Sequence, residues 1–167
     1  MSFPLRSWAG ALLLLGGLAS ARADLQVGEV FPSLPAAGLA GGDLPATDGK
    51  VALVDFWASW CAPCRASFAA LARLHEEFVP GGLVIVAVSV DEKPAAFAGF
   101  VKLRRPPFAT VNDHAQKLVS AVKVPVMPSS YLLDRHGRVR FIHAGFHGKE
   151  TEEELRREIT ALLAEKE

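Results

Sequence analysis

The sequence predicts one α/β domain, in which helices flank a central mixed β-sheet behind an N-terminal extension. Short apolar runs alternate with stretches whose apolar residues recur every three or four positions, as in strands joined by amphipathic helices. The last two strand-like runs are separated by a short polar turn, which predicts an antiparallel hairpin. Residues 24–167 are enough for a single domain with its own hydrophobic core.

The first 23 residues are predicted to be a signal peptide. Arg6 precedes an apolar stretch from Trp8 to Leu18, and small residues follow. We expect cleavage after Ala23, which ends an A-x-A pattern. A retained membrane anchor is the alternative, but the apolar stretch is well short of the ~20 residues that a spanning helix needs. We therefore expect an exported, periplasmic protein whose domain comprises residues 24–167.

Charge limits the partners that such a domain can have. The whole chain carries 18 basic and 18 acidic residues, and both basic residues of the first 23 are arginines. Without them the domain is slightly acidic. A nucleic-acid-binding domain needs a basic face, so we expect no nucleic acid as a partner. Nothing in the sequence indicates more than a monomer.

The elements can be taken in chain order. Residues 25–50 are rich in Gly, Pro and Ala and predict a loosely structured segment with a short hairpin. The spacing and its breakers then predict strands over 51–57, 83–90, 108–111, 129–133 and 138–143. Helices are predicted over 62–79, from Pro94 to the Arg105-Pro106-Pro107 breaker, after a cap at Asn112 or Asp113, and from a capping box formed by Thr151 and Glu154. Gly137 occupies the hairpin turn, where positive φ is expected.

Both cysteines of the chain lie in one Cys61-Ala62-Pro63-Cys64 motif. A structural disulfide stabilises mainly by closing a long loop, and this loop has only two residues between its ends. The pair is predicted where a strand meets a helix, so unpaired N–H groups and the helix dipole favour a negative sulfur on Cys61. Cys64 lies one turn inside the helix and is expected to be more buried. We predict that Cys61 is the nucleophile and Cys64 the resolving thiol of a dithiol.

Asp55 interrupts an otherwise apolar strand, where a charge is expensive to bury. Burial is expected to raise its pKa and to make it a proton acceptor for Cys64. The alternative is a carboxyl group that only forms a hydrogen bond with neighbouring backbone. Its position six residues before Cys61 favours the catalytic role.

Two stretches resemble the thioredoxins. Residues 54–64 read VDFWASWCAPC and resemble the thioredoxin active-site signature, and residues 124–134 read VPVMPSSYLLD. With the N-terminal segment, the chain is similar to exported thioredoxin-like thiol–disulfide oxidoreductases of the TlpA/ResA type. The similarity extends from Val27 to the C-terminus and implies a thioredoxin-like fold.

The resemblance also implies roles for individual residues. Pro128 corresponds to a cis-proline opposite the cysteines, which leaves the Met127 backbone free to pair with a substrate. From the sequence alone, an ordinary trans proline at the start of a strand is the alternative. Trp60 flanks the active site as a substrate-binding residue, whereas Trp57 is expected in the core. Glu92 resembles an acidic residue that tunes the cysteine pair, although a solvated carboxylate is the alternative. Pro63 sits in the dipeptide that sets the redox potential.

The sequence departs from the thioredoxin pattern near Asp55. Many thioredoxins place a Lys on the next strand, and the matching position here is Ala87. Without that ammonium group the pKa of Asp55 is expected to rise further. The Ala-Pro dipeptide between the cysteines also replaces the usual Gly-Pro.

The predicted function is therefore a protein-disulfide oxidoreductase without a cofactor. We expect it to reduce disulfides in exported partner proteins, with cytochrome c maturation or metal-site assembly as candidate pathways. A membrane thiol–disulfide electron transporter would recharge it. A thiol oxidase or isomerase with the same fold is the alternative, and equilibrium with glutathione separates the two.

A copper-binding thiol chaperone is a second alternative, but copper-delivering relatives separate their cysteines by three residues. A peroxidase is not favoured, because no Thr-x-x-Cys signature is present. His143 and His147 stand four apart, but Gly145 and Gly148 argue against a helix there. We therefore predict no metal site.

Overall fold

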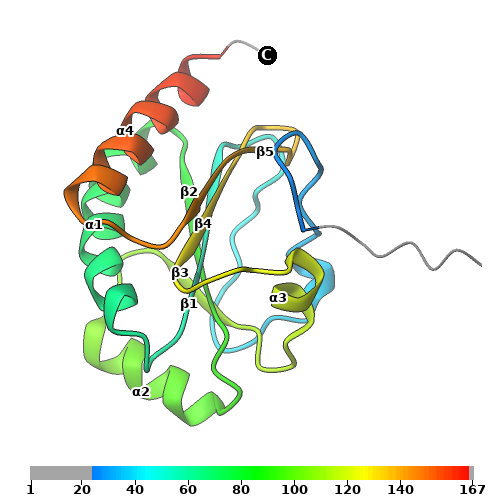
Figure 1. Ribbon diagram of the computed structural model, residues 1–167, viewed down its shortest axis with the longest axis vertical. Coiled ribbons are helices and arrows are strands. Elements are labelled where there is room, and N and C mark those ends of the chain that lie inside the picture. Colours follow the sequence, from blue (N-terminus) through cyan, green and yellow to red (C-terminus); the bar gives the residue numbers. More distant parts are fainter. Residues whose placement is uncertain (1–23, 166–167) are drawn as a thin grey trace, which may run out of the picture.

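The computed structural model describes residues 24–165, so the predicted signal peptide and its cleavage site lie outside the described residues. In this part of the chain, five strands and four α-helices follow one another in the predicted order, and they form three layers (Figure 1). The element bounds are β1 (Ala52–Trp57), α1 (Ala62–Phe78), β2 (Val84–Ser89), α2 (Pro94–Arg104), β3 (Ala109–Asn112), α3 (Lys117–Val122), β4 (Ser129–Leu133), β5 (Val139–Ala144) and α4 (Lys149–Ala164). Within this part of the chain, no helix combines the length and apolarity needed to cross a membrane.

The five strands form one mixed sheet in the order β3-β2-β1-β4-β5. β1, β2 and β3 pair in parallel, β4 pairs antiparallel with β1, and β5 pairs antiparallel with β4 through the hairpin. The parallel strands are connected by helical crossovers, as parallel pairing requires. β1 is the central strand, so its register brings Asp55 opposite Ala87 on β2 and Ser130 on β4.

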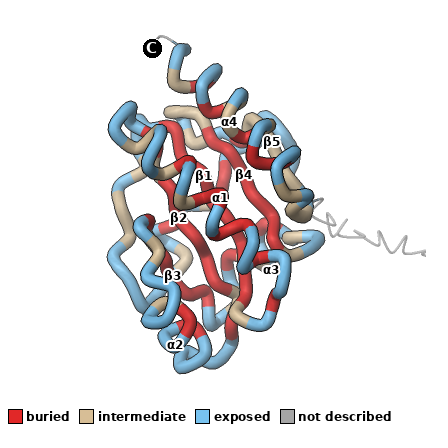
Figure 2. The backbone as a smooth tube through the Cα atoms, turned by 90° about the vertical axis from the view of Figure 1, so that its left-hand side faces the viewer, coloured by how far each residue is buried: buried red, intermediate tan, exposed pale blue. Residues whose placement is uncertain are grey.

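Two hydrophobic cores lie on the two faces of this sheet, and Figure 2 shows its central strands buried. Helices α1, α2 and α4 cover one face, and α3 covers the other with the N-terminal segment (Figure 1). Side chains of β1 alternate between the faces, so Leu53 and Trp57 point towards α1 while Val54 and Phe56 point away. The same alternation places Asp55 on the α1 face.

The N-terminal segment does not contain the predicted hairpin. It has one turn of 3-10 helix at Pro35–Ala37, and it pairs with distant parts of the chain at two isolated bridges. Val30 pairs with Arg138 beside β5, and Ala40 pairs with Asn112 on β3. Its backbone hydrogen bonds therefore go to both edges of the sheet, which a local hairpin would have prevented.

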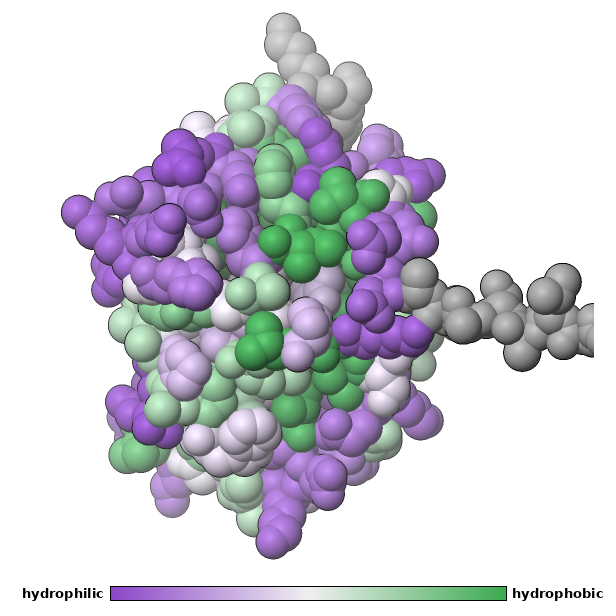
Figure 3. All heavy atoms as spheres, viewed as in Figure 1, coloured by the Kyte–Doolittle hydropathy of each residue, from purple (hydrophilic) through white to green (hydrophobic). Residues whose placement is uncertain are grey.

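Helix α4 begins at Lys149, two residues before the predicted capping box. Thr151 accepts a hydrogen bond from the backbone N–H of His147 at 3.0 Å and so joins the first turn to the preceding loop. Glu152 is buried against α1, where Arg73 donates to both of its carboxylate oxygens at 2.9 and 2.6 Å. This contact between helices fixes the start of α4. Figure 3 shows the hydrophilic surface over this part of the molecule.

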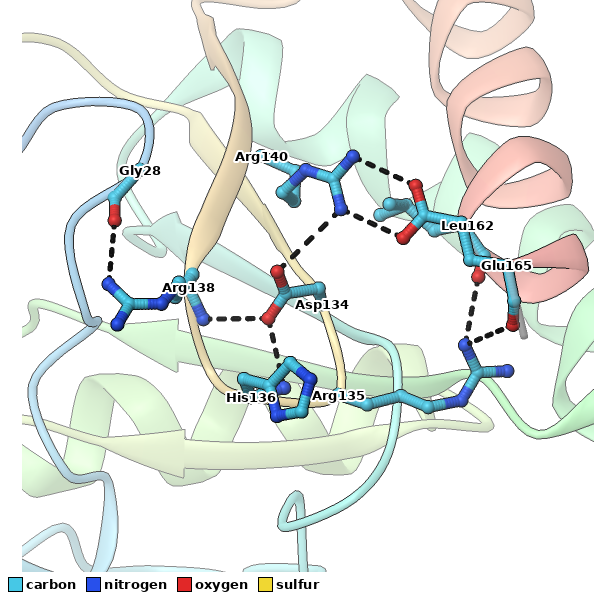
Figure 4. Close-up of polar contacts among 8 residues, drawn as sticks. All are labelled: Gly28, Asp134, Arg135, His136, Arg138, Arg140, Leu162 and Glu165. Atoms are coloured by element: carbon cyan, nitrogen blue, oxygen red, sulfur yellow. Dashed lines mark hydrogen bonds and ion pairs between the residues drawn. The ribbon is translucent and has the colours of Figure 1, made fainter. Parts of the chain in front are cut away.

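The β4–β5 turn fastens the other end of α4 (Figure 4). Asp134 accepts hydrogen bonds from the backbone N–H groups of His136 and Arg138, and Gly137 has the expected positive φ of 70°. Arg135 donates to carbonyl groups in the last turn of the helix, those of Leu162, Leu163 and Glu165. A cation at a helix C-terminus satisfies carbonyls that have no partner within the helix.

Candidate active site

The cysteine motif lies where β1 passes into α1. Cys61 is the N-cap of the helix, and its sulfur accepts a hydrogen bond from the backbone N–H of Cys64 at 3.2 Å. The two cysteines form a disulfide with their Cα atoms 5.3 Å apart. Cys61 is 4% exposed and Cys64 is fully buried. The predicted order of burial is therefore confirmed, because Cys61 keeps a small solvent-exposed area and Cys64 has none.

The start of α1 suits a sulfur that carries negative charge. The N–H of Cys64 is one of the groups that have no partner within a helix, and it points at Cys61. Pro63 lies in the first turn, where its missing N–H removes no helical hydrogen bond. The geometry therefore favours a thiolate on Cys61 when the disulfide opens.

Asp55 is fully buried beneath this helix. Ser130 on β4 donates a hydrogen bond to its Oδ1 at 2.6 Å, and its Oδ2 has no partner among residues 24–165. Burial raises the pKa of Asp55 to about 7, and the hydrogen bond from Ser130 lowers it only in part. Ala87 stands opposite Asp55 on β2, as predicted, so no ammonium group comes from that position. A carboxyl group with this pKa can exchange a proton near neutral pH.

The segment before β4 forms a second wall of the site. The Met127–Pro128 peptide bond is cis, as the resemblance implies. The carbonyl of Pro128 accepts a hydrogen bond from Gly145 at 2.8 Å, whereas the backbone of Met127 has no hydrogen bond within the described part of the chain. Met127 packs against the core that contains both cysteines. Its backbone is thus open to pairing with an extended peptide.

The two tryptophans of the motif lie in different surroundings, one on the surface and one in the core. Trp60 is 70% exposed immediately before Cys61, so it offers an apolar surface beside the disulfide. Trp57 is fully buried, with its ring centroid 4.8 Å from that of Phe68 and 4.5 Å from that of Phe100. The expected core position of Trp57 is confirmed.

Glu92 is exposed, and its side chain has no hydrogen bond or ion pair among the residues that the structure describes. The carboxylate that contacts the active-site turn is its neighbour Asp91, which accepts hydrogen bonds from Ser59. Sequence reasoning missed Asp91 and the contact of Ser130 with Asp55. For Asp91, the available signal is a carboxylate placed directly after a strand that is apolar except for Ser89.

His143 and His147, which were considered as a metal site, have different surroundings. The Nε2 atom of His143 lies 2.7 Å from Glu158 on α4, and its Nδ1 lies 3.5 Å from Glu154. His147 lies in the loop before α4, where its backbone N–H bonds Thr151. His143 thus joins β5 to α4.

Comparison with known proteins agrees with this geometry. A model of the AhpC/TSA family matches residues 27–142. Thiol-disulfide oxidoreductase ResA of Bacillus thuringiensis (strain Al Hakam) is 28% identical over 135 residues, which cover 80% of this chain and 78% of that protein. The ResA protein of Bacillus subtilis (strain 168) is 33% identical over 91 residues, which cover 54% of this chain and 51% of that protein.

A solved structure extends the similarity to the whole fold. A protein described as a thiol:disulfide interchange protein DsbE from Chlorobium tepidum is 30% identical, with a TM-score of 0.76. The match covers 84% of this chain and 100% of that one. Together with the disulfide at the N-terminus of α1, these matches show that the chain belongs to the AhpC/TSA family and is a thiol–disulfide oxidoreductase of the ResA/DsbE type.

Proposed function

We propose that this oxidoreductase reduces disulfides in exported partner proteins, with Cys61 as nucleophile, Cys64 as resolving thiol and Asp55 as proton acceptor. The observation that carries the proposal is the asymmetry of the pair. Cys61 is the helix N-cap and receives an N–H hydrogen bond, whereas Cys64 is fully buried in the first turn. The first sulfur can attack, and the second is reserved for an intramolecular step.

The reaction has two exchange steps. The Cys61 thiolate attacks one sulfur of the client disulfide, forms a mixed disulfide and releases one client thiolate, which takes a proton from water. Cys64 then passes its proton to Asp55 and attacks the sulfur of Cys61. The second client sulfur leaves as a thiolate, which takes a proton from water, and the Cys61–Cys64 disulfide forms. The client gains two electrons, and the dithiol loses them.

Substrate binding would use the surface around the sulfur. Trp60 and the half-exposed Val126 provide apolar contacts, and the free backbone of Met127 would pair with the client segment. A recognition mode based on main-chain hydrogen bonds suits several unrelated clients, because every extended peptide offers the same groups. Pro63 would adjust the redox potential through the first turn of α1.

Trapping identifies the client class. We expect Cys64→Ser to accumulate mixed disulfides on Cys61 in the exported compartment, because the resolving step is lost. Cys61→Ser is the matched control, since it keeps the buried thiol and removes the attacking one. Mass spectrometry of the captured proteins would show whether they include apocytochromes c or metal-site assembly factors. Equal capture by both variants would contradict the proposed roles.

The direction of electron flow has a separate test. A reductant must have a disulfide that is stable against glutathione, so we expect the oxidised form to dominate in mildly reducing glutathione buffers. A strongly oxidising pair would instead support a thiol oxidase or isomerase. The oxidised protein would be recharged by a membrane thiol–disulfide electron transporter.

Export rests on the N-terminal sequence. The proposal predicts that the protein isolated from the periplasm begins at Asp24, because Ala23 ends the small-residue pattern after the apolar stretch. N-terminal sequencing by mass spectrometry measures this directly. An intact first segment in the membrane fraction would instead indicate an anchor. We expect the processed protein to sediment as a monomer.

A further inference from the structure

A buried carboxylate supports the turn that carries the active cysteine. Asp91 is only 3% exposed, and its carboxylate accepts hydrogen bonds from two serines. Ser59 donates its backbone N–H, at 3.1 and 3.3 Å from the two carboxylate oxygens, and its hydroxyl at 2.9 Å. Ser89 donates its hydroxyl at 2.9 Å. No Lys, Arg or His in residues 24–165 forms an ion pair with Asp91, so hydrogen bonds alone compensate its charge.

Hydrogen bonds from neighbouring strands also fix the backbone at and before Asp91. Asn112, at the end of β3, donates its amide to the backbone carbonyl of Asp91 at 2.9 Å and to that of Ser89 at 3.3 Å. The backbone N–H of Val90 donates to the carbonyl of Trp57 at 2.8 Å. Asp91 is therefore a fixed point at the ends of three parallel strands, and the β1–α1 turn is attached to it.

The attached turn leads directly into the N-cap. Ser59 precedes Cys61 by two residues, and the N–H of Cys61 donates to the carbonyl of Ala58 at 3.1 Å. The position of the Cys61 sulfur over the N–H of Cys64 depends on this turn, because the N-cap residue adopts an extended backbone conformation rather than a helical one.

We propose that Asp91 is a positioning residue that acts through Ser59 to hold Cys61 at the N-cap and thereby sets the reactivity of its thiolate. The inference rests on the proposed role of Cys61 as nucleophile. It assigns the acidic control of the site to a buried residue that touches the active-site turn. The exposed Glu92, which the sequence indicated for this role, makes no such contact.

Substitution of Ser59 tests this role more cleanly than substitution of Asp91. Loss of the Asp91 charge would favour a thiolate nearby, whereas loss of the support would disfavour it, so the two effects oppose one another. Ser59→Ala keeps the carboxylate and the backbone N–H contacts and removes only the hydroxyl donor, so the single effect is a weaker support, which disfavours the thiolate. Ser89→Ala is the control, because it removes a hydroxyl hydrogen bond of the same 2.9 Å length from the same carboxylate, together with the acceptor of the Asp91 backbone N–H at 3.1 Å, but changes no group of the turn.

The experiment measures alkylation of Cys61 by iodoacetamide in the reduced protein at pH 7, located by mass spectrometry. Rapid alkylation of Cys61 in the wild type tests its role as nucleophile independently of the variants. We expect Ser59→Ala to slow alkylation by about threefold to tenfold and Ser89→Ala to leave it unchanged. The equilibrium constant with glutathione should shift in the first variant only. Equal rates in both variants, whether slowed or unchanged, would overturn the positioning role.

A second variant distinguishes an effect of Asp91 that acts through Ser59 from a general loss of stability. In an Asp91→Asn background, Ser59→Ala should have a smaller effect on the alkylation rate than it has in the wild type, because the contact that it removes is already weakened. Denaturant unfolding of each variant shows how much overall stability has changed. Effects of Asp91→Asn and Ser59→Ala that multiply independently would exclude action through Ser59.

Discussion

In the proposed mechanism, the titration of Asp55 controls the resolving step. Its pKa of about 7 means that the carboxylate, the proposed acceptor of the Cys64 proton, becomes available as the pH rises towards neutrality. We expect single-turnover reduction of a fluorescent peptide disulfide to accelerate with pH around this midpoint. Asp55→Asn should slow the second step by roughly a hundredfold or more at pH 8, because the proton acceptor is lost.

Ser130→Ala is the control for this prediction. It keeps the carboxyl group and removes the hydrogen bond that lowers the pKa of Asp55, so the midpoint should move to higher pH. The rate at high pH should approach that of the wild type. A midpoint that survives in Asp55→Asn would assign the titration to another group.

Asp55 also makes the free energy of unfolding depend on pH. The pKa of Asp55 is raised from 3.8 to about 7 by burial, so between these values the folded state keeps a proton that the unfolded state has released. The free energy of unfolding therefore falls as the pH rises through this window, by about 4 kcal/mol when it has been crossed. Glu152 affects stability mainly below this window, between about 2 and its ordinary value of 4.5, since the hydrogen bond from Arg73 lowers the pKa of that carboxyl group to about 2.

Urea unfolding of the oxidised protein at pH 5 and pH 8 measures this effect, because disulfide-bonded cysteines do not titrate. Asp55→Asn should flatten the pH dependence and be more stable than the wild type at pH 8. The Asn carbonyl can still accept the hydrogen bond from Ser130. An unchanged slope in the variant would contradict the assignment of this proton to Asp55.

At the scale of elements, the end of α4 depends on a turn that is distant in sequence. Arg135 donates to three carbonyl groups of the last turn, and Arg140 forms a two-point contact with Glu165 (Figure 4). Arg135→Ala should lower the free energy of unfolding by about 1–2 kcal/mol, because partly buried carbonyls lose a charged donor. Thermal or urea unfolding measures the change.

Arg138→Ala provides the comparison. Its guanidinium donates to the carbonyl of Gly28 in an exposed part of the N-terminal segment, so its loss should change stability by less than about 0.5 kcal/mol. Equal losses in both variants would show that the hairpin, and not the end of α4, depends on these arginines.

The boundary of α4 also shows what sequence can predict. Local periodicity predicted the order of strands and helices, the strand-to-helix junction at Cys61 and the unusual Asp55. The capping box at Thr151 was wrong because Arg73 on α1 holds Glu152 and fixes the start of the helix. Partners 79 residues apart leave no local pattern.

The missed contacts of the site have the same origin. Ser130 reaches Asp55 only because β4 pairs antiparallel with β1 in one particular register. Asp91 reaches Ser59 only because β2 lies parallel to β1 and both strands end at the same edge of the sheet. Register is set by packing of the whole sheet, so these contacts could not be read from either strand alone.

At the scale of the whole molecule, the active site is built where three strands meet. β1 supplies Asp55 and leads into Cys61, β2 leads to Asp91, and β4 supplies Ser130. Because the folded sheet holds these groups together, the redox state of the cysteines and the stability of the fold must be linked. A disulfide that is favoured by the folded protein stabilises that protein by the same free energy.

This linkage gives a test of the proposed direction of electron flow that needs no client. For a reductant, the folded protein favours the disulfide more than the unfolded chain does, so the oxidised form should be the more stable one. We expect a difference of roughly 2–4 kcal/mol in the free energy of unfolding, measured by urea with and without reductant. Cys61→Ser/Cys64→Ser is the control, and its stability should not respond to reductant. A reduced form more stable than the oxidised form would mean that the fold stabilises the dithiol, which is the property of a thiol oxidase.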